Sequence, residues 1–182
     1  AVEQQDNPKL KGKPIAVGHD AERGVVSTAS YEARRFGVHS AQSIQLAKRL
    51  CPELIIVEPH FQRYKEVSAH LHEIFHEYTD LIEPISLDEA FLDVTENKKG
   101  IELAVDIAKE IKQRIYQTTG LTASAGVSYC KFIAKIASDW RKPDGLTVIH
   151  PDRALDFISR LKVDRIWGVG PKTAEKMHHM GI

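Results

Sequence analysis

Two adjacent carboxylates, Asp88 and Glu89, stand beside a strand-like stretch in ISLDEAFLDV, residues 85–94. A buried charge without a partner is costly, so the pair lies either in an exposed turn or beside a divalent cation. Oxygen ligands of this type suit Mg²⁺ or Mn²⁺. Neighbours in a regular strand point to opposite faces, so both reach one metal cluster only if the backbone bends, for example at Ser86 and Leu87. Two cations need a third acidic residue from elsewhere, and Asp93 lies too far along the strand.

A second set of chemically capable residues lies in STASYEARRFG, residues 27–37. Thr28 stands at a predicted strand-to-helix junction, and Tyr31 and Arg34 follow on one face of the predicted helix. A hydroxyl, a phenol and a guanidinium near a helix N-terminus predict a site for an anion, best of all a polyphosphate. The alternative is an ordinary capped surface helix.

Two stretches in the C-terminal third are basic. CKFIAKIASDWRKPDGLTVI, residues 130–149, places Lys142 on a Pro-Asp-Gly turn, where it is either a fixed point charge or a solvated turn residue. In RIWGVGPKTAEKM, residues 165–177, the turn Gly168-Val169-Gly170 precedes a predicted helix and resembles a helix-hairpin-helix. Such a turn presents backbone N–H groups to a DNA phosphate, and Lys172 adds a positive charge.

The pentapeptide HEIFH, residues 72–76, matches a zinc-protease pattern, with His72 and His76 one helical turn apart and Glu73 as a base. The residues that follow offer neither a glycine turn nor a third histidine. We therefore favour a solvated helix face beside an apolar stripe.

Apolar periodicity and turn residues predict an alternation of short strands and helices. The predicted strands span residues 14–18, 23–29, 54–57, 81–86, 89–94, 122–128 and 146–149, and the predicted helices span 31–36, 43–50, 61–78, 101–118, 131–140, 152–161 and 171–180. The first residues also look like the interior of a helix. Two long helices and several mostly antiparallel strands over 61–149 predict an α/β (α+β) fold with helices on one face of a sheet, and the ferredoxin-like split βαβ is the natural candidate.

The bulk composition is that of an ordinary soluble domain or two: 182 residues, 42% hydrophobic and 27% charged. Two cysteines, Cys51 and Cys130, form neither a disulfide framework nor a zinc quartet, so we expect a reducing, cytoplasmic setting without membrane attachment. The net charge is zero, but residues 121–182 carry ten Lys/Arg against six Asp/Glu, which weakly suggests a polyanionic partner. Both ends look abrupt, so we expect a piece of a longer protein.

Together these stretches resemble the Y-family DNA polymerases, and the resemblance covers essentially the whole chain. It rests, in the family's order, on VEQQDNPKLKGKPIAV, GVVSTASYEARRFGVHS, EPISLDEAFLDVT, LTASAGVSYCKFIAKIASDWRKPDG and IWGVGPKTAEKM. The resemblance implies fingers over residues 1–59, a ferredoxin-like palm over 60–149, and the first part of a helical thumb over 150–182. It also implies translesion DNA synthesis in damage tolerance, with primer-template DNA and a dNTP as partners and a sliding clamp contacted through a segment beyond this chain.

The resemblance also assigns roles to residues. It implies that Asp88 and Glu89 hold two Mg²⁺ ions, or Mn²⁺, for attack of a primer 3′-hydroxyl on the α-phosphate. Thr28, Tyr31, Arg34 and Lys142 match the residues that bind the triphosphate. The family pattern begins with a strand that carries a further aspartate and aromatic residues, and this chain starts after it. We therefore expect the 182 residues alone to be inactive. We also expect the protein to be a monomer.

Two other classes of protein stay open on the residues alone. A nucleotidyl cyclase could share the palm, although it needs no DNA-phosphate turn such as Gly168–Gly170. A non-catalytic DNA-binding module needs neither the carboxylate pair nor the triphosphate residues.

Overall fold

The computed structural model describes residues 1–182, which form two compact units, Ala1–Val67 and Ser68–Ile182. The division falls inside the long helix α4 (Phe61–His76). Each unit has its own sheet structure and its own apolar core. None of the helices is long and apolar enough to cross a membrane.

The first unit is built around a three-stranded sheet of order β2-β1-β3. Strand β1 (Ile15–Val17) pairs antiparallel with β2 (Thr28–Ala29) and parallel with β3 (Ile55–Val57). The other elements are α1 (Val2–Asp6), the 3₁₀ turn η1 (Pro8–Leu10), α2 (Tyr31–Arg34) and α3 (Ile44–Leu50). Buried residues of the sheet, α2 and α3, including Ala16, Ala33 and Ile44, form the core, which fixes α2 against the sheet.

The second unit contains two separate strand pairs. Strands β4 (Ile82–Pro84) and β5 (Ala90–Leu92) are antiparallel, whereas β6 (Ala125–Val127) and β7 (Leu146–Val148) are parallel. The expectation of mostly antiparallel strands is therefore wrong for the second pair. The reason is the helix α6 (Lys131–Trp140), which crosses between β6 and β7 and so returns the chain in the same direction.

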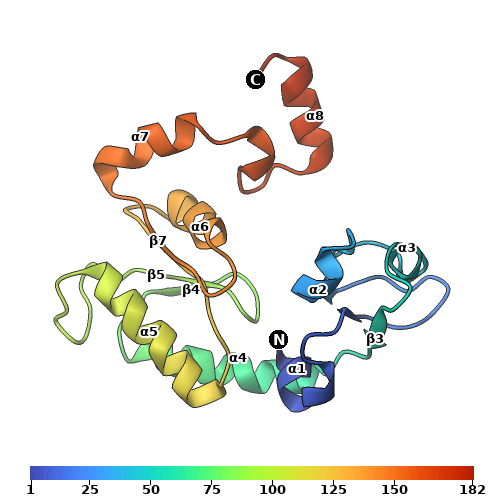
Figure 1. Cartoon of the computed structure of the whole chain (residues 1–182). Coiled ribbons are helices and arrows are strands. Elements are labelled where there is room, and N and C mark those ends of the chain that lie inside the picture. Colours follow the sequence, from blue (N-terminus) through green and yellow to red (C-terminus); the bar gives the residue numbers. More distant parts are fainter. The chain divides into compact units, whose positions relative to one another are not determined.

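Helices cover both sides of these strands. In Figure 1, α5 (Ala104–Thr119) and α4 lie below β4 and β5, and α6 lies above them. The lower layer is joined by a core of Ile74, Tyr78, Ile107 and Ile115. Helix α5 ends where Gly120 adopts a left-handed φ of +67°, a conformation that glycine reaches without steric cost.

Gly126 explains how α6 comes so close to the sheet. A Cβ at this position would lie 2.0 Å from the carbonyl oxygen of Ala134, so only glycine allows the contact. Side chains on the sheet-facing side of α6, with Ile133, Ile136 and Ala137 buried, are thereby held in a fixed position over the strands. The glycine therefore sets where the lysines of α6 can reach.

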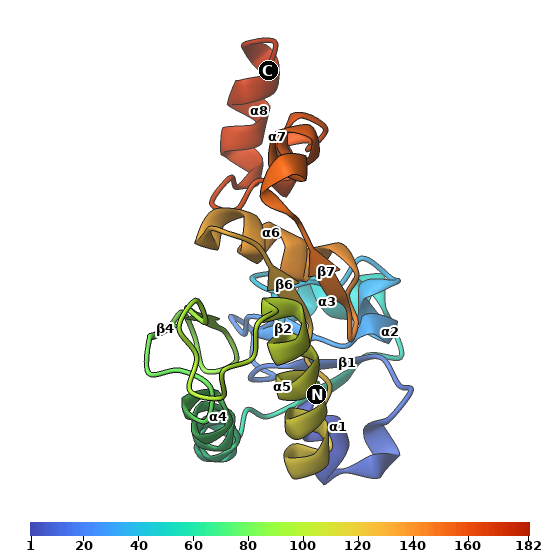
Figure 2. The same ribbon diagram turned by 90° about the vertical axis from the view of Figure 1, so that its left-hand side faces the viewer.

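The C-terminal part of the second unit is helical, as Figure 2 shows. It consists of α7 (Pro151–Ser159), the 3₁₀ turn η2 (Val163–Arg165) and α8 (Pro171–His179). Val163 and Ala174 are buried, which packs η2 against α8 and supports the turn between them.

The predicted elements are found in the predicted order, most of them with shorter bounds, while α6 has the predicted ones. The strand predicted over residues 23–29 is reduced to Thr28–Ala29, because the backbone of Val26 bonds to Gln42 and Ala41 instead of continuing the sheet. The apolar stripe predicted from Phe61 to Tyr78 holds in part, because Ser68 and Tyr78 are buried and Leu71 and Phe75 pack against the core. Phe61 is 57% exposed, while Val67 and Ile74 are buried.

Candidate metal centre and phosphate-binding surfaces

Asp88 and Glu89 lie in a bend between β4 and β5, outside the regular part of either strand. The bend is closed by the carbonyl of Glu89, which accepts from the N–H of Ile85 at 2.9 Å and from that of Ser86 at 3.2 Å. The Ser86 hydroxyl donates to Asp88 Oδ1 at 2.8 Å. The alternation of strand side chains is broken here, which is the backbone bend that two ligands for one metal cluster require.

The two carboxylates differ in their surroundings. Asp88 is exposed, whereas the Glu89 side chain is 35% exposed and its Oε1 accepts from Lys135 Nζ at 2.5 Å. The second oxygen of each carboxylate accepts no hydrogen bond from the chain. Two anionic oxygens are thus available, and a hard divalent cation fits that chemistry.

No group of three or more His, Cys, Asp or Glu side chains in residues 1–182 is arranged to hold a metal ion. Asp93 follows β5 and is engaged locally, since hydrogen bonds from Thr95 lower its pKa, with a smaller contribution from the charge of Lys131. In the zinc-protease pattern, His76 Nδ1 lies 3.0 Å from Asp80 Oδ1, and the ring of His72 meets Phe75 edge-on.

The basic residues after β6 do not act as one patch. Lys131 forms an ion pair with Glu83 on β4, and Lys142 Nζ lies 2.6 Å from Asp139 Oδ1. Lys142 stands in the turn between α6 and β7, as its sequence predicts, but with this acidic neighbour one helical turn away. Sequence reasoning missed the contact of Lys135 with Glu89. The spacing of Lys131 and Lys135, one turn apart on α6, was the available signal.

In the first unit, Tyr31 and Arg34 lie in α2, and Thr28 lies in β2 just before it. Arg34 Nε donates to the carbonyl of Ala29 at 3.0 Å, and its Cζ lies 5.6 Å from the centroid of the Tyr31 ring. Thr28, Tyr31 and Arg34 are exposed, and we call them the phosphate cluster. The two terminal nitrogens of the guanidinium make no hydrogen bond within the chain, so the side chain is oriented through Nε and its outer edge is open.

The helix N-terminus contributes less to this cluster than its sequence suggests. Helix α2 has four residues, and the hydroxyl of Ser30 already accepts from the N–H of Ala33 at 3.2 Å. One helical turn has a weak dipole, so affinity for an anion must come from the side chains. Ser30 Oγ also accepts from the N–H of Ile15 at 3.0 Å, which ties this corner to β1.

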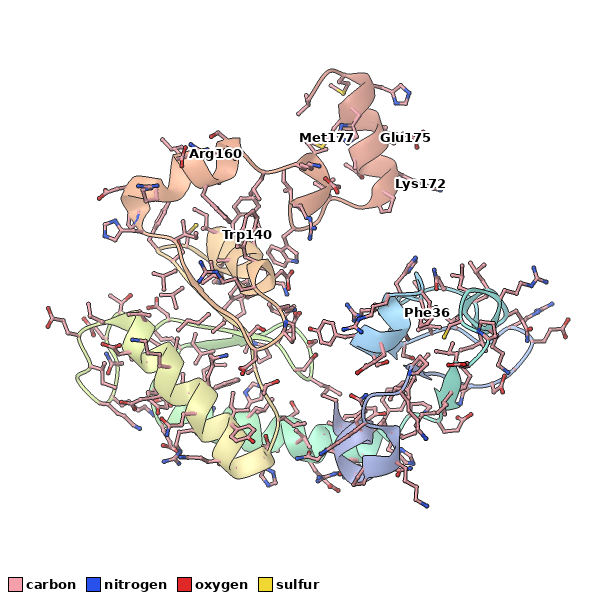
Figure 3. The ribbon with its side chains drawn as sticks, viewed as in Figure 1. Phe36, Trp140, Arg160, Lys172, Glu175 and Met177 are labelled. Carbon is pink, nitrogen blue, oxygen red and sulfur yellow. The ribbon has the colours of Figure 1, made fainter.

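The turn Gly168-Val169-Gly170 connects η2 to α8. Gly168 has a φ of +89°, the N–H of Val169 donates to Ile166 at 3.0 Å, and Gly170 is the N-cap of α8. The N–H groups of Gly168 and Gly170 donate to no group of the chain, and both residues are exposed. Lys172 projects outward from the first turn of α8 (Figure 3). An anion at this turn would meet two open donors and one ammonium group.

The fold is that of the solved Y-family DNA polymerases. The chain superposes with a TM-score of 0.92 and 38% identity on a structure described as DinB from Sulfolobus solfataricus, covering 100% of this chain and 54% of that one. A structure described as an insertion ternary complex of Dbh DNA polymerase matches with a TM-score of 0.90 at 38% identity, over 100% and 54% of the two chains.

The family assignment is specific. Residues 1–139 match the model of the impB/mucB/samB family, and residues 151–182 match the model described as the IMS family HHH motif. The chain therefore belongs to the impB/mucB/samB family.

Curated relatives are similar along the whole chain. It is 70% identical to DNA polymerase IV of Bacteroides fragilis and 62% identical to DNA polymerase IV of Akkermansia muciniphila, over 182 residues in both cases. Those matches cover 50% and 51% of the relatives. The chain thus spans about half the length of the curated relatives that it matches.

Proposed function

We propose that the protein of which these residues are part is a DNA-directed DNA polymerase of translesion synthesis. The observation that carries the proposal is the bend at Asp88 and Glu89, which brings two carboxylates with available oxygens to one edge of the second unit. It stands beside the similarity to proteins named DNA polymerase IV.

Asp88 and Glu89 would hold two divalent cations, Mg²⁺ or Mn²⁺. Such a pair, when bound, lowers the pKa of an attacking hydroxyl and stabilises the charge on a departing pyrophosphate. The chain's own contribution is to orient the carboxylates. Ser86 fixes Asp88 by its hydroxyl, and the Glu89 carbonyl closes the bend.

A third carboxylate is needed to neutralise two cations, and residues 1–182 contain no such group. The strands of the second unit suggest where it would come from. β5 pairs only with β4, and β6 pairs only with β7, so each has one open edge. A further strand between them would join the two pairs into one sheet and place its side chains beside Glu89. The polymerase resemblance expects such a strand, with an aspartate on it.

The triphosphate of a dNTP is proposed to bind Thr28, Tyr31 and Arg34 of the first unit, and the polymerase resemblance also assigns Lys142 to triphosphate binding. Arg34 offers a planar pair of donors to phosphate oxygens, and Thr28 and Tyr31 offer hydroxyl groups. Lys142 would exchange its ion pair with Asp139 for one with the phosphate, because the carboxylate and the phosphate are both anions.

Primer-template DNA is proposed to contact the turn Gly168-Val169-Gly170 and Lys172 through its phosphates. The two open N–H groups of the glycines support this assignment. The domain division into fingers at 1–59, palm at 60–149 and the first part of a thumb at 150–182 belongs to the same proposal, as do a cytoplasmic location, a monomeric state and contact with a sliding clamp.

The test is primer extension by the protein at the length of its relatives, in the presence of Mg²⁺ or Mn²⁺. Template-directed incorporation of dNTP is expected. The residues 1–182 alone are expected to bind Mn²⁺ weakly and to extend no primer. Robust extension by these 182 residues would contradict the need for a third carboxylate, and inactivity at full length in both metals would contradict the polymerase proposal.

A further inference from the structure

Lys135 is a largely buried lysine whose side chain contacts a proposed metal ligand. Its side chain is 11% exposed, and the ammonium donates to Glu89 Oε1 at 2.5 Å. The ammonium makes no other hydrogen bond, and the chain offers it no second carboxylate. A buried ammonium needs an anionic partner, so Glu89 is what allows Lys135 to be buried.

The position of Lys135 is set by the close packing of α6. Gly126 lets the backbone of α6 at Ala134 approach β6, and Lys135 is the next residue along the helix. The backbone of Lys135 is held in place while the helix stays packed, so its ammonium stays within reach of Glu89. It therefore competes for Glu89 directly, as a fixed counter-ion, and unlike a mobile surface lysine.

We propose that Lys135 is the counter-ion of Glu89 in the metal-free protein and that a divalent cation, entering at the free Oε2 of Glu89, displaces it. The inference rests on the proposed metal role of Glu89. A dication and an ammonium at one carboxylate repel each other, and the repulsion is strong where water is largely excluded. Lys135 thus keeps Glu89 oriented before the metal arrives, and it lowers the affinity for that metal. It is a positioning residue, because it acts through Glu89.

Displacement also gives the ammonium a second role. Once Glu89 is engaged by a cation, Lys135 loses its only carboxylate partner while it stays buried. An anionic group that arrives with the cation would then satisfy it. The structure thereby links occupation of Glu89 by a divalent cation to acceptance of an anion beside it.

Lys131 provides a matched control. It lies one turn earlier on α6 and pairs with Glu83 on β4, but its side chain is 59% exposed and it contacts neither Asp88 nor Glu89. Replacing it removes the same charge from the same helix. Any general electrostatic effect of a lost lysine appears in both variants, and the specific effect only at Lys135.

The experiment is Mn²⁺ binding to residues 1–182, measured by the loss of the free-ion electron paramagnetic resonance signal. Lys135→Gln is expected to tighten binding by about tenfold, Lys131→Gln by less than about twofold, and Lys135→Arg to leave it near that of the unchanged chain. In a Glu89→Gln background, Lys135→Gln should bring no further gain. Weaker or unchanged binding in Lys135→Gln would overturn the inference.

The Glu89→Gln variant separates the two proposals. If Mn²⁺ binding does not weaken in Glu89→Gln, the metal site itself is wrong and this inference falls with it. If binding weakens there but does not tighten in Lys135→Gln, the metal site stands and only the counter-ion role is refuted.

A second measurement needs no substitution and so does not depend on the folding of a variant. The ¹⁵N resonances of the lysine ammonium groups are followed during titration with Mg²⁺, which is diamagnetic. The Lys135 signal is expected to shift or broaden as Glu89 is occupied, while that of Lys131 stays in place. A Lys135 signal that does not change at saturating Mg²⁺ would overturn the inference.

Discussion

The phosphate cluster of the first unit and the carboxylate pair of the second differ in how their charges are compensated. Arg34 is oriented by a neutral carbonyl and contacts no acidic side chain. Glu89 is paired with Lys135 within the same unit. The first arrangement presents a cation that only a ligand can neutralise. In the second, the carboxylate already has a counter-ion, which a bound metal would displace. The difference predicts that anion binding needs little rearrangement, while metal binding involves the exchange of one cation for another.

The largest expected effect concerns the carboxylate pair. In the protein at the length of its relatives, Asp88→Ala or Glu89→Ala should lower kcat for primer extension at least about a hundredfold, because each removes a ligand from the cation pair. Duplex affinity, measured by fluorescence anisotropy, should survive, since the proposed phosphate contacts lie elsewhere. Near-normal extension by Asp88→Ala would remove the metal assignment of this bend.

Substitutions in the phosphate cluster should weaken the binding of dNTP. Arg34→Ala at full length is expected to raise KM for dNTP about tenfold or more, since a charge-assisted hydrogen bond is lost. Lys at this position should rescue only in part, because it lacks the planar pair of donors. Arg35→Ala is the matched control, as it removes the adjacent exposed arginine. Equal effects of the two alanine variants would show that Arg34 is an ordinary surface arginine with no specific role in dNTP binding.

The turn at Gly168–Gly170 should show a smaller, sequence-independent effect. Lys172→Ala at full length is expected to weaken binding to any duplex evenly and to lower the slope of log affinity against log salt by about one unit. Lys176→Ala, one turn further along α8, serves as the control. If both variants keep the original slope, the turn has a structural role only.

The smallest effect concerns a part-buried contact of the first unit, outside both sites. Burial raises the pKa of Tyr64 to about 12, with a further contribution from its hydrogen bond to Glu3. Its folded-state pKa is above the unfolded value, so this stabilisation is complete below about pH 10 and is lost as the pH rises towards 12.

Tyr64→Phe should therefore flatten the decline of stability between pH 10 and 12, by about 1 kcal/mol at most. Urea unfolding at several pH values measures it, with Tyr116→Phe, an exposed tyrosine of α5, as the control. An identical decline in Tyr64→Phe and the unchanged chain would show that Tyr64 does not cause it.

Much of the fold follows from local sequence. Periodic apolar residues predicted α4 and α5, and Gly120 marked the end of α5, because these signals depend only on neighbours along the chain. The residues of α6 were predicted at their observed bounds, Lys131–Trp140. The strand predicted from Arg23 failed because Val26 pairs with a distant loop, and no local pattern encodes that choice.

The candidate site divides in the same way. The residue types and spacing of Thr28, Tyr31 and Arg34 predict that they share one surface, since all three lie within seven residues of one another; in the structure all three are exposed and Arg34 lies beside Tyr31. That Asp88 and Glu89 stand in a bend was also predicted, from Ser86 and Leu87. The chemistry of these residues and the bend that holds the carboxylates both depend on residues that are neighbours along the chain.

Only the tertiary structure decided which charges meet. Lys135 and Glu89 are 46 residues apart, and their contact depends on the approach of α6 to β6 that Gly126 allows. The same holds for the parallel pairing of β6 and β7 and for the open edges of β5 and β6. A sequence determines which residues can bind a metal or a phosphate. The packing of distant elements determines which of them is already neutralised by another, because electrostatic partners are chosen by distance in space and not along the chain.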